Sequence, residues 1–424
     1  MDFDAPMREM AESRLSNGIR IFSEEMEESS SASVGIWVNV GSRDEIMEYH
    51  GCTHFLEHLL FKGTLNRSAK DISKAIEERG GYLNAFTDRD MTCFHAKVLG
   101  KDLKIALEVL SDIVQNPLLK QEDLEKERTV VLSEIDSRDD DPGDLIHDLY
   151  FESIWGENEA AHPILGERAP LNDITSDSIR YYFEKHYLPS KMIVTGAGAL
   201  KHEDFVAIIE KNLILNNKPN GAKKREKPEF KPVKRHIQRQ TSQVQLALTS
   251  KGLAYGDPKR DALNLTSSYL GVGASSKLFQ EIREKYGLVY SIFSTGYSLS
   301  DAGVFAILAG TQDKYVEKIL KIELRELGAL KANLSERALQ KIKHKTTGLF
   351  VLHSESSESR MMQLGVSSLR QGKPKTLEEV ISGINSVELS SIKELAEDTF
   401  AIDCLGLTTL GLSESTVKKL DALF

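Results

Sequence analysis

Two histidines and a glutamate share one face of a predicted helix near the start of the chain. The run is His54-Phe55-Leu56-Glu57-His58. Positions i and i+4 of a helix point the same way, with Cβ atoms roughly 5–6 Å apart, so both imidazoles can reach one Zn²⁺ at about 2.0–2.1 Å. Glu57 lies beside them without being needed as a ligand, so it is free to take a proton from a water whose pKa the metal lowers to around 7. The pattern predicts a hydrolytic zinc site.

A third ligand must come from elsewhere, because catalytic zinc sites usually have three protein ligands and one open position. The predicted helix at 121–138 offers Glu122, Glu125, Glu127 and Glu134. Glu127 and Glu134 are two helical turns apart and so share a face. Either could instead be a solvated or ion-paired helix glutamate, and the residues alone leave this open.

Length, charge and cysteine content exclude several classes of protein. The 424 residues correspond to roughly two or three domains, and the formal net charge of −10 argues against a nucleic-acid partner. The three cysteines, Cys52, Cys93 and Cys404, are too few and too scattered for a disulfide framework or a thiolate zinc site. The charged N-terminal segment has no apolar signal region, and no apolar run approaches the ~20 residues of a membrane span. We therefore expect a cytoplasmic protein without a membrane segment.

One break divides the chain into two halves. Turn-forming residues at 216–221, followed by a basic, proline-containing stretch that ends at Pro232, are typical of a solvated surface linker. We predict a first domain at residues 1–215, a linker at 216–232 and a second domain at 233–424.

The two halves show the same order of hydrophobic patterns. Each reads as a strand, two helices, two strands and two more helices. In the first half these are 32–40, the His54 helix, 69–79, 82–86, 91–98, 101–115 and 121–138. In the second half they are 243–249, 258–270, 276–286, 288–295, 303–308, 313–332 and 335–352. The order predicts an α+β fold with two homologous domains, each a mostly antiparallel sheet covered by helices.

Only the first half carries the metal-binding residues. The predicted helix at 258–270 has no counterpart of the two histidines. Aligning 123–126 with 338–341 puts Ile342 opposite Glu127 and Leu349 opposite Glu134. In the half that lacks the histidines, apolar residues thus stand at the positions of both carboxylates. The two histidines are therefore not merely residues that this fold needs for packing.

These residues resemble the insulinase/pitrilysin family of inverted-motif zinc peptidases, which includes the mitochondrial processing peptidase and short two-domain bacterial members. The family's His-x-x-Glu-His motif is followed about 75 residues later by a glutamate ligand, and 75 residues separate His58 from Glu134 here. The resemblance implies one Zn²⁺ per subunit, held by His54, His58 and Glu134. It implies Glu57 as the general base, Glu127 as a supporting carboxylate and a fold of the LuxS and mitochondrial-processing-peptidase type.

Two other segments extend the resemblance. Tyr82-Leu83-Asn84-Ala85-Phe86-Thr87 resembles the family's edge strand, which binds an extended peptide by β-augmentation, and this implies substrate-binding roles for Asn84, Ala85 and Phe86. Arg283 and Tyr290 resemble a family pair that reaches the substrate and the oxyanion developing at the scissile carbonyl. A less specific match is His162-Pro163 followed by Gly166.

Plainer interpretations of the same residues remain open. Asn84 could be a turn residue, and Arg283 and Tyr290 could be a surface arginine and a packed strand tyrosine. We expect the three cysteines to pack as small buried hydrophobes, although Cys52, next to the motif, could leave a thiol near the site.

The resemblance implies a zinc metalloendopeptidase acting on unfolded or extended peptides. The family's chamber contains four such domains and this chain has two, so we expect a homodimer in which Arg283 and Tyr290 of one subunit complete the zinc site of the other. A heterodimer stays open. The alternative function is a non-catalytic scaffold or assembly subunit of the same family, although such members typically lose ligands that are present here. A carboxylate-bridged iron pair would need a second Glu-x-x-His element on another helix, and none of the other predicted helices carries one.

Overall fold

The chain forms two compact units, each assembled from three stretches of sequence. The computed structural model describes residues 9–215, 224–420 and 423. Unit 1 comprises Met1–Ile135, Pro163–Arg225 and Phe350–Leu377, and unit 2 comprises Asp136–His162, Glu226–Leu349 and Glu378–Phe424. Part of the predicted linker, residues 216–223, lies outside the described residues.

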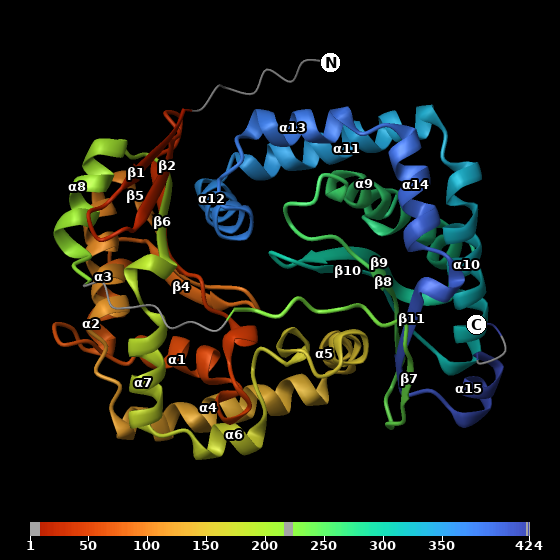
Figure 1. Ribbon diagram of the computed structural model, residues 1–424, viewed down its shortest axis with the longest axis horizontal. Coiled ribbons are helices and arrows are strands. Elements are labelled where there is room, and N and C mark those ends of the chain that lie inside the picture. Colours follow the sequence, from red (N-terminus) through yellow and green to blue (C-terminus); the bar gives the residue numbers. More distant parts are fainter. Residues whose placement is uncertain (1–8, 216–223, 421–422, 424) are drawn as a thin grey trace. The chain divides into compact units, whose positions relative to one another are not determined.

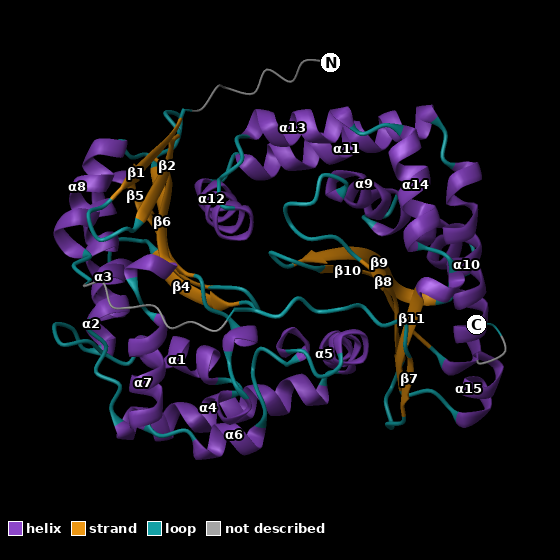
Figure 2. Ribbon diagram, viewed as in Figure 1, coloured by secondary structure: helices purple, strands orange, loops and turns teal. Residues whose placement is uncertain are grey.

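Unit 1 is built on a six-stranded sheet with the order β1-β2-β6-β3-β5-β4 (Figure 1, Figure 2). Neighbouring strands are antiparallel except for the parallel pair β2 and β6. The strands are β1 Met10–Arg14, β2 Arg20–Glu25, β3 Ser31–Val38, β4 Tyr82–Thr87, β5 Thr92–Leu99 and β6 Met192–Gly198. Strand β4 forms one edge of this sheet, so one side of its backbone has no neighbouring strand among the described residues.

Helices cover both faces of the unit 1 sheet. Along β3, Val34 and Ile36 point into the core formed with the main group of helices, whereas Trp37 points into a smaller core on the opposite face, as the two-residue period of a strand requires. Figure 1 shows α3 and α8 on one side of the sheet and α12 on the other. The helices are α1 Cys52–Leu60, α2 Ala69–Glu77, α3 Leu103–Gln115, α4 Gln121–Asp140, α6 Arg168–Asp173, α7 Ser176–His186, α8 His202–Asn212 and α12 Ser357–Gln371.

Unit 2 repeats this plan with a five-stranded sheet in the order β7-β11-β8-β10-β9. Its strands are β7 Lys234–Ile237, β8 Val244–Lys251, β9 Val289–Ser298, β10 Gly303–Thr311 and β11 Leu405–Leu410. Its helices are α5 Pro142–Trp155, α9 Arg260–Gly271, α10 Val316–Asn333, α11 Glu336–Ser354, α13 Leu377–Ser386, α14 Leu389–Thr399 and α15 Glu414–Leu420. Strand β9 holds the edge position that β4 holds in unit 1.

In each unit, one face of the sheet is covered by a helix that belongs to the other half of the sequence. Helix α12 packs on β2, β3 and β6 of unit 1, and Gly365 lets it approach so closely that a Cβ there would lie 2.0 Å from the Trp37 ring. The buried Arg360 of α12 forms an ion pair with Glu24 of β2. Helix α5 packs on β8 and β11 of unit 2 through an apolar face that includes Ile154. Neither sheet is therefore covered on both faces by one continuous half of the sequence.

The predicted fold class is confirmed: both units are mostly antiparallel sheets flanked by helices. One local prediction was wrong. The segment predicted as an α-helix at 276–286 contains a π-helix at Phe279–Glu284, whose wider turn ends with the Lys285 N–H donating to the Gln280 carbonyl five residues earlier. Within the described residues, none of the helices is long and apolar enough to cross a membrane.

Candidate metal centre

Helix α1 begins at a tight backbone junction that fixes its first turn. Gly51 precedes the helix with φ +89°, a left-handed conformation that disfavours side chains, and a Cβ there would lie 2.8 Å from the Leu165 carbonyl oxygen. The buried carboxylate of Glu45 accepts hydrogen bonds from the N–H groups of Gly51 and Thr53 at 2.8 and 2.6 Å, which satisfies donors that a first turn leaves free. Gly166 abuts Gly51, since a Cβ at Gly166 would lie 2.3 Å from the Gly51 Cα. The weaker motif around Gly166 therefore supports the start of the histidine helix.

The apolar side of α1 is anchored in the core of unit 1. Phe55, Leu56 and Leu59 are buried there. The polar residues of the motif keep some access to solvent: the side chains of His54 and His58 are 13% and 19% exposed. A rigid helix thus presents both imidazoles at a partly open surface.

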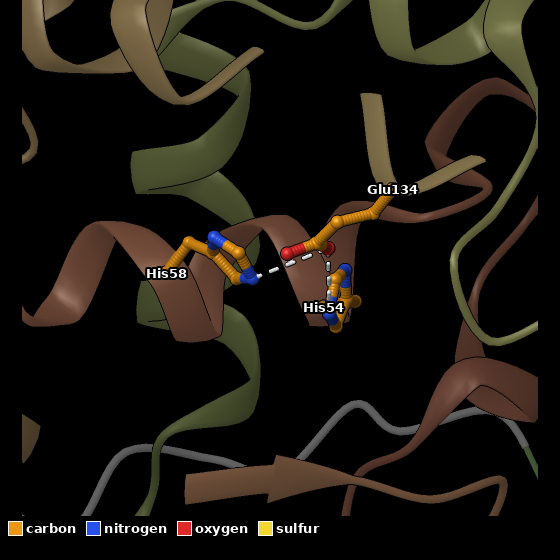
Figure 3. A group of neighbouring side chains, drawn as sticks. All are labelled: His54, His58 and Glu134. Atoms are coloured by element: carbon orange, nitrogen blue, oxygen red, sulfur yellow. Dashed lines mark ion pairs between the residues drawn. The ribbon is translucent and has the colours of Figure 1, made fainter. Parts of the chain in front are cut away.

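The structure brings His54, His58 and Glu134 of α4 together. Figure 3 shows the Glu134 carboxylate facing both imidazoles, with Oε2 3.8 Å from His54 Nε2 and 3.6 Å from His58 Nε2. These spacings exceed the 2.7–3.2 Å of a hydrogen bond, but two ligands held at about 2.0–2.1 Å by one tetrahedral zinc lie roughly 3.4 Å apart. Among the described residues, this is the one group of three or more candidate ligands whose ligand atoms lie within 4.8 Å of one another.

Electrostatics favour a neutral, metal-ready His54. Burial, and secondarily the neighbouring His58, lower the pKa of His54 to about 3. The two rings are 4.7 Å apart between centroids, so a proton on one disfavours a proton on the other. An unprotonated imidazole has the lone pair that a metal requires.

Glu127, the predicted supporting carboxylate, lies behind His58. Its Oε2 is 3.2 Å from His58 Nδ1 and its Oε1 is 2.6 Å from Lys62 Nζ, while its side chain is only 9% exposed. Because Nδ1 is engaged by Glu127, His58 turns Nε2 toward Glu134. Sequence reasoning missed Lys62, although its i+4 spacing from His58 on the same helical face was a usable signal.

Glu57 is a buried carboxylate beside the two imidazoles. Its side chain accepts a hydrogen bond from Thr87 Oγ1 at 2.5 Å. Burial raises the pKa of Glu57; the hydrogen bond from Thr87 and the charge of His58 oppose this, and Glu134 adds to it. A carboxyl group with a raised pKa is suited to accept and return a proton near neutral pH. Thr87 lies in the segment that resembles the family's edge strand, but no role was predicted for it.

The predicted substrate residues lie on the free edge strand β4. Leu83 and Ala85 pack toward the core of unit 1, so Thr87 shares their face by alternation. Phe86 lies on the opposite face against Trp37, with ring centroids 5.8 Å apart. Asn84 is exposed, and its Oδ1 accepts a hydrogen bond from the adjacent Ala85 N–H at 2.9 Å. The edge that a peptide can reach is therefore formed by the strand's backbone.

Arg283 and Tyr290 lie together, but in unit 2. The Arg283 guanidinium carbon is 5.4 Å from the centroid of the Tyr290 ring and 4.8 Å from that of Phe279. Tyr290 is 77% exposed on the edge strand β9, so the interpretation as a packed strand tyrosine is wrong. Tyr290 is thus presented at the surface of unit 2, with the half-buried Arg283 beside it.

The structure confirms the expectation that Cys52 is a small buried hydrophobe and corrects the expectation that the linker charges are all solvated. Cys52 is fully buried in the apolar core, and this burial raises the pKa of its thiol well above the usual range, so the residue packs as a small hydrophobe. Arg225, in the segment predicted to be a solvated linker, forms ion pairs with Asp44 and Asp90 at 2.6 and 3.3 Å.

The fold and the side chains together define a candidate metal centre: two imidazoles and a carboxylate from two helices of unit 1, whose sheet has an edge strand without a neighbouring strand among the described residues. Comparison with known families agrees. Residues 20–168 match the family model "Insulinase (Peptidase family M16)", and residues 173–346 match "Peptidase M16 inactive domain".

Relatives cover nearly the whole chain. A protein of Streptomyces coelicolor described as an uncharacterized zinc protease is 37% identical over 394 residues, which span 91% of this chain and 86% of that protein. A protein of Bacillus subtilis with the same description is 35% identical over 388 residues, 91% of this chain and 95% of that one. The chain belongs to the M16 peptidase family.

Solved structures share the fold. A protease from Helicobacter pylori superposes with a TM-score of 0.88 at 24% identity, covering 95% of this chain and all of that one. A Pseudomonas fluorescens structure described as a peptidase M16 inactive domain also gives 0.88, at 21% identity, covering 96% and 98% of the two chains. At these identities the likeness concerns the fold alone.

Proposed function

We propose that the protein is a zinc metalloendopeptidase that cleaves unfolded or extended peptides. The observation that carries this proposal is the convergence of His54, His58 and Glu134 within 4.8 Å, with the buried carboxylate of Glu57 on the same helix. The open edge of β4 supplies a docking surface for an extended chain, since its free backbone groups can add one more strand.

The donor set fits zinc. Two imidazoles and one carboxylate are usual ligands of a catalytic zinc ion, and the low pKa of His54 keeps its ring in the form that binds metal. Zinc bound there would acidify a water molecule and polarise a peptide carbonyl.

Residues of the chain would transfer the proton, orient a ligand and stabilise the oxyanion. Glu57 accepts the proton of the attacking water and delivers it to the leaving amine. Glu127 holds the His58 ring through Nδ1. Arg283 and Tyr290 are donors of the kind that stabilises the oxyanion of a tetrahedral intermediate.

We further propose a homodimer with composite sites, in which Arg283 and Tyr290 act on the zinc site of the other subunit. Support comes from the presence of both sets of residues in one chain and from the exposure of Tyr290. A cytoplasmic location and one zinc per subunit belong to the same proposal.

The first experiment replaces Glu57. Purified Glu57→Gln should keep the wild-type zinc content and lose cleavage of an unstructured fluorogenic peptide, because the amide cannot take the proton. Glu78→Gln is the matched control and should behave as wild type, since Glu78 directly follows α2 and its side chain is 64% exposed. Full activity in zinc-loaded Glu57→Gln would refute the assignment, and an inactive, zinc-free wild type would favour the non-catalytic scaffold.

A mixing experiment tests the composite sites. Glu57→Gln and Arg283→Ala are each expected to be inactive alone. Co-expressed mixed dimers should regain activity, because one of their two sites combines an intact Glu57 with an intact Arg283. Verified mixed dimers without activity would contradict the proposed sharing.

A further inference from the structure

We infer that Thr87 is a positioning residue for Glu57, and that strand β4 thereby joins two tasks: docking an extended peptide and orienting the general base. This inference rests on the proposed function. Nothing in the sequence patterns or in the family match assigns Thr87 a role.

The contact itself is short and directional. The Thr87 hydroxyl donates to Glu57 Oε2 at 2.5 Å, and the Glu57 residue is only 9% exposed. A glutamate side chain has several rotatable bonds, so a single strong donor that fixes one carboxylate oxygen also sets where the other oxygen points. The bond spans 30 residues of sequence and connects helix α1 to the sheet edge.

Thr87 cannot easily move away, because the turn that follows β4 is anchored from several parts of the chain. Asp88 N–H donates to the Met91 carbonyl at 2.8 Å and closes the turn. The Asp88 carboxylate pairs with Arg370 of α12 at 2.6 Å. The buried Asp90 carboxylate pairs with Arg43 at 3.0 Å and with Arg225 at 3.3 Å. Ion pairs from three separate segments therefore fix the end of the strand that carries Thr87.

The same strand has its other backbone side free. β4 hydrogen-bonds to β5 on one side and has no described strand on the other. A peptide that pairs with this free side would restrain the β4 backbone along its whole length. That length includes Thr87, which pairs with Thr92 of β5 at the end of the strand. Docking a substrate strand and holding Glu57 thus depend on the same six residues, Tyr82–Thr87.

The test compares Thr87→Val, Thr87→Ser and Thr129→Val. Valine keeps the shape of threonine but removes the donor, serine keeps the donor, and Thr129 is an exposed threonine of α4 that controls for the chemical change itself. Thr87→Val should bind zinc as wild type and lose roughly 10–100-fold in kcat with KM within about threefold, because the loss falls on a proton transfer worth about 10²–10⁴-fold. Thr87→Ser should recover to within about threefold of wild type, and Thr129→Val should match wild type.

A crystal structure of Thr87→Val supplies a readout independent of activity. The Glu57 side chain should adopt a different rotamer or become disordered in that variant, while it keeps its place in Thr87→Ser. Wild-type kcat in Thr87→Val, or an unmoved Glu57, overturns the inference. If wild-type protein itself cleaves no peptide, the proposed function fails instead, and the crystal structures still decide whether Thr87 positions Glu57.

Discussion

Replacing Glu127 by glutamine should weaken zinc binding without removing a ligand. The Glu127 carboxylate lies between two partners, 3.2 Å from His58 Nδ1 and 2.6 Å from Lys62 Nζ, and its side chain is 9% exposed. Glutamine has nearly the same shape but no charge, so it holds the His58 ring less firmly and leaves Lys62 without its anion. Loss of such an outer partner typically costs 10–100-fold in metal affinity, or about 1.4–2.7 kcal/mol.

The assay is a zinc titration of the metal-free protein in competition with a chromophoric chelator at neutral pH. Glu134→Gln should lose more affinity than Glu127→Gln, because it removes one of three ligands. Glu125→Gln is the matched control: Glu125 lies on the same helix but its side chain is 54% exposed. The reasoning is refuted if Glu127→Gln binds zinc as tightly as wild type, or if Glu127→Gln loses more affinity than Glu134→Gln.

Two further predictions concern stability. Burial raises the pKa of Glu323 to about 8, and neither of its carboxylate oxygens has a hydrogen-bond partner among the described residues. The folded state therefore keeps a proton that the unfolded chain releases above pH ~4.5, so unfolding free energy should fall by about 1.4 kcal/mol per pH unit between pH ~4.5 and ~8. Because the pKa of Glu45 is also raised to about 8, Glu323→Gln should remove only the Glu323 share of this slope in denaturant titrations, and a slope unchanged from wild type would contradict the burial of Glu323 as its cause. Gly365→Ala should destabilise the protein by roughly 1–3 kcal/mol or more, since its Cβ would lie 2.0 Å from the Trp37 ring. Gly328→Ala in α10 should be neutral or stabilising when both variants are compared in thermal melts, because no described atom beyond the neighbouring residues and the helix's own backbone lies within 4 Å of an added Cβ.

The shared faces of the candidate ligands were predictable because that information is local, whereas the choice of Glu134 as the third ligand came from the resemblance to the family. Two histidines at i and i+4 on a helix must share a face, and two glutamates seven apart on another helix must do so too. The apolar counterparts of Glu127 and Glu134 in the second half then marked which carboxylates are not needed for packing. Ile342, opposite Glu127, is buried at 7% exposure, whereas Leu349, opposite Glu134, is 43% exposed, so only the first counterpart packs in a core.

The exchanged helices and the supporting contacts were not predictable in this way. No local pattern shows that residues 350–377 pack on the sheet of unit 1, because an apolar helix face does not specify which sheet it covers. Thr87 lies 30 residues from Glu57, and its role depends on the fold that joins α1 to β4. In the sequence, Arg225 is one of several charged residues of the predicted linker, and only the fold shows its ion pair with Asp44. These residues act through long-range contacts, which hydrophobic periodicity does not encode.

The most direct test of the central claim is anomalous diffraction from crystals of the zinc-loaded protein, recorded on both sides of the zinc absorption edge. The account predicts one zinc peak per chain at about 2.0–2.1 Å from His54 Nε2, from His58 Nε2 and from a Glu134 carboxylate oxygen. Crystals of peptide-cleaving protein with no zinc at these three residues, or with zinc held by other side chains, would contradict it.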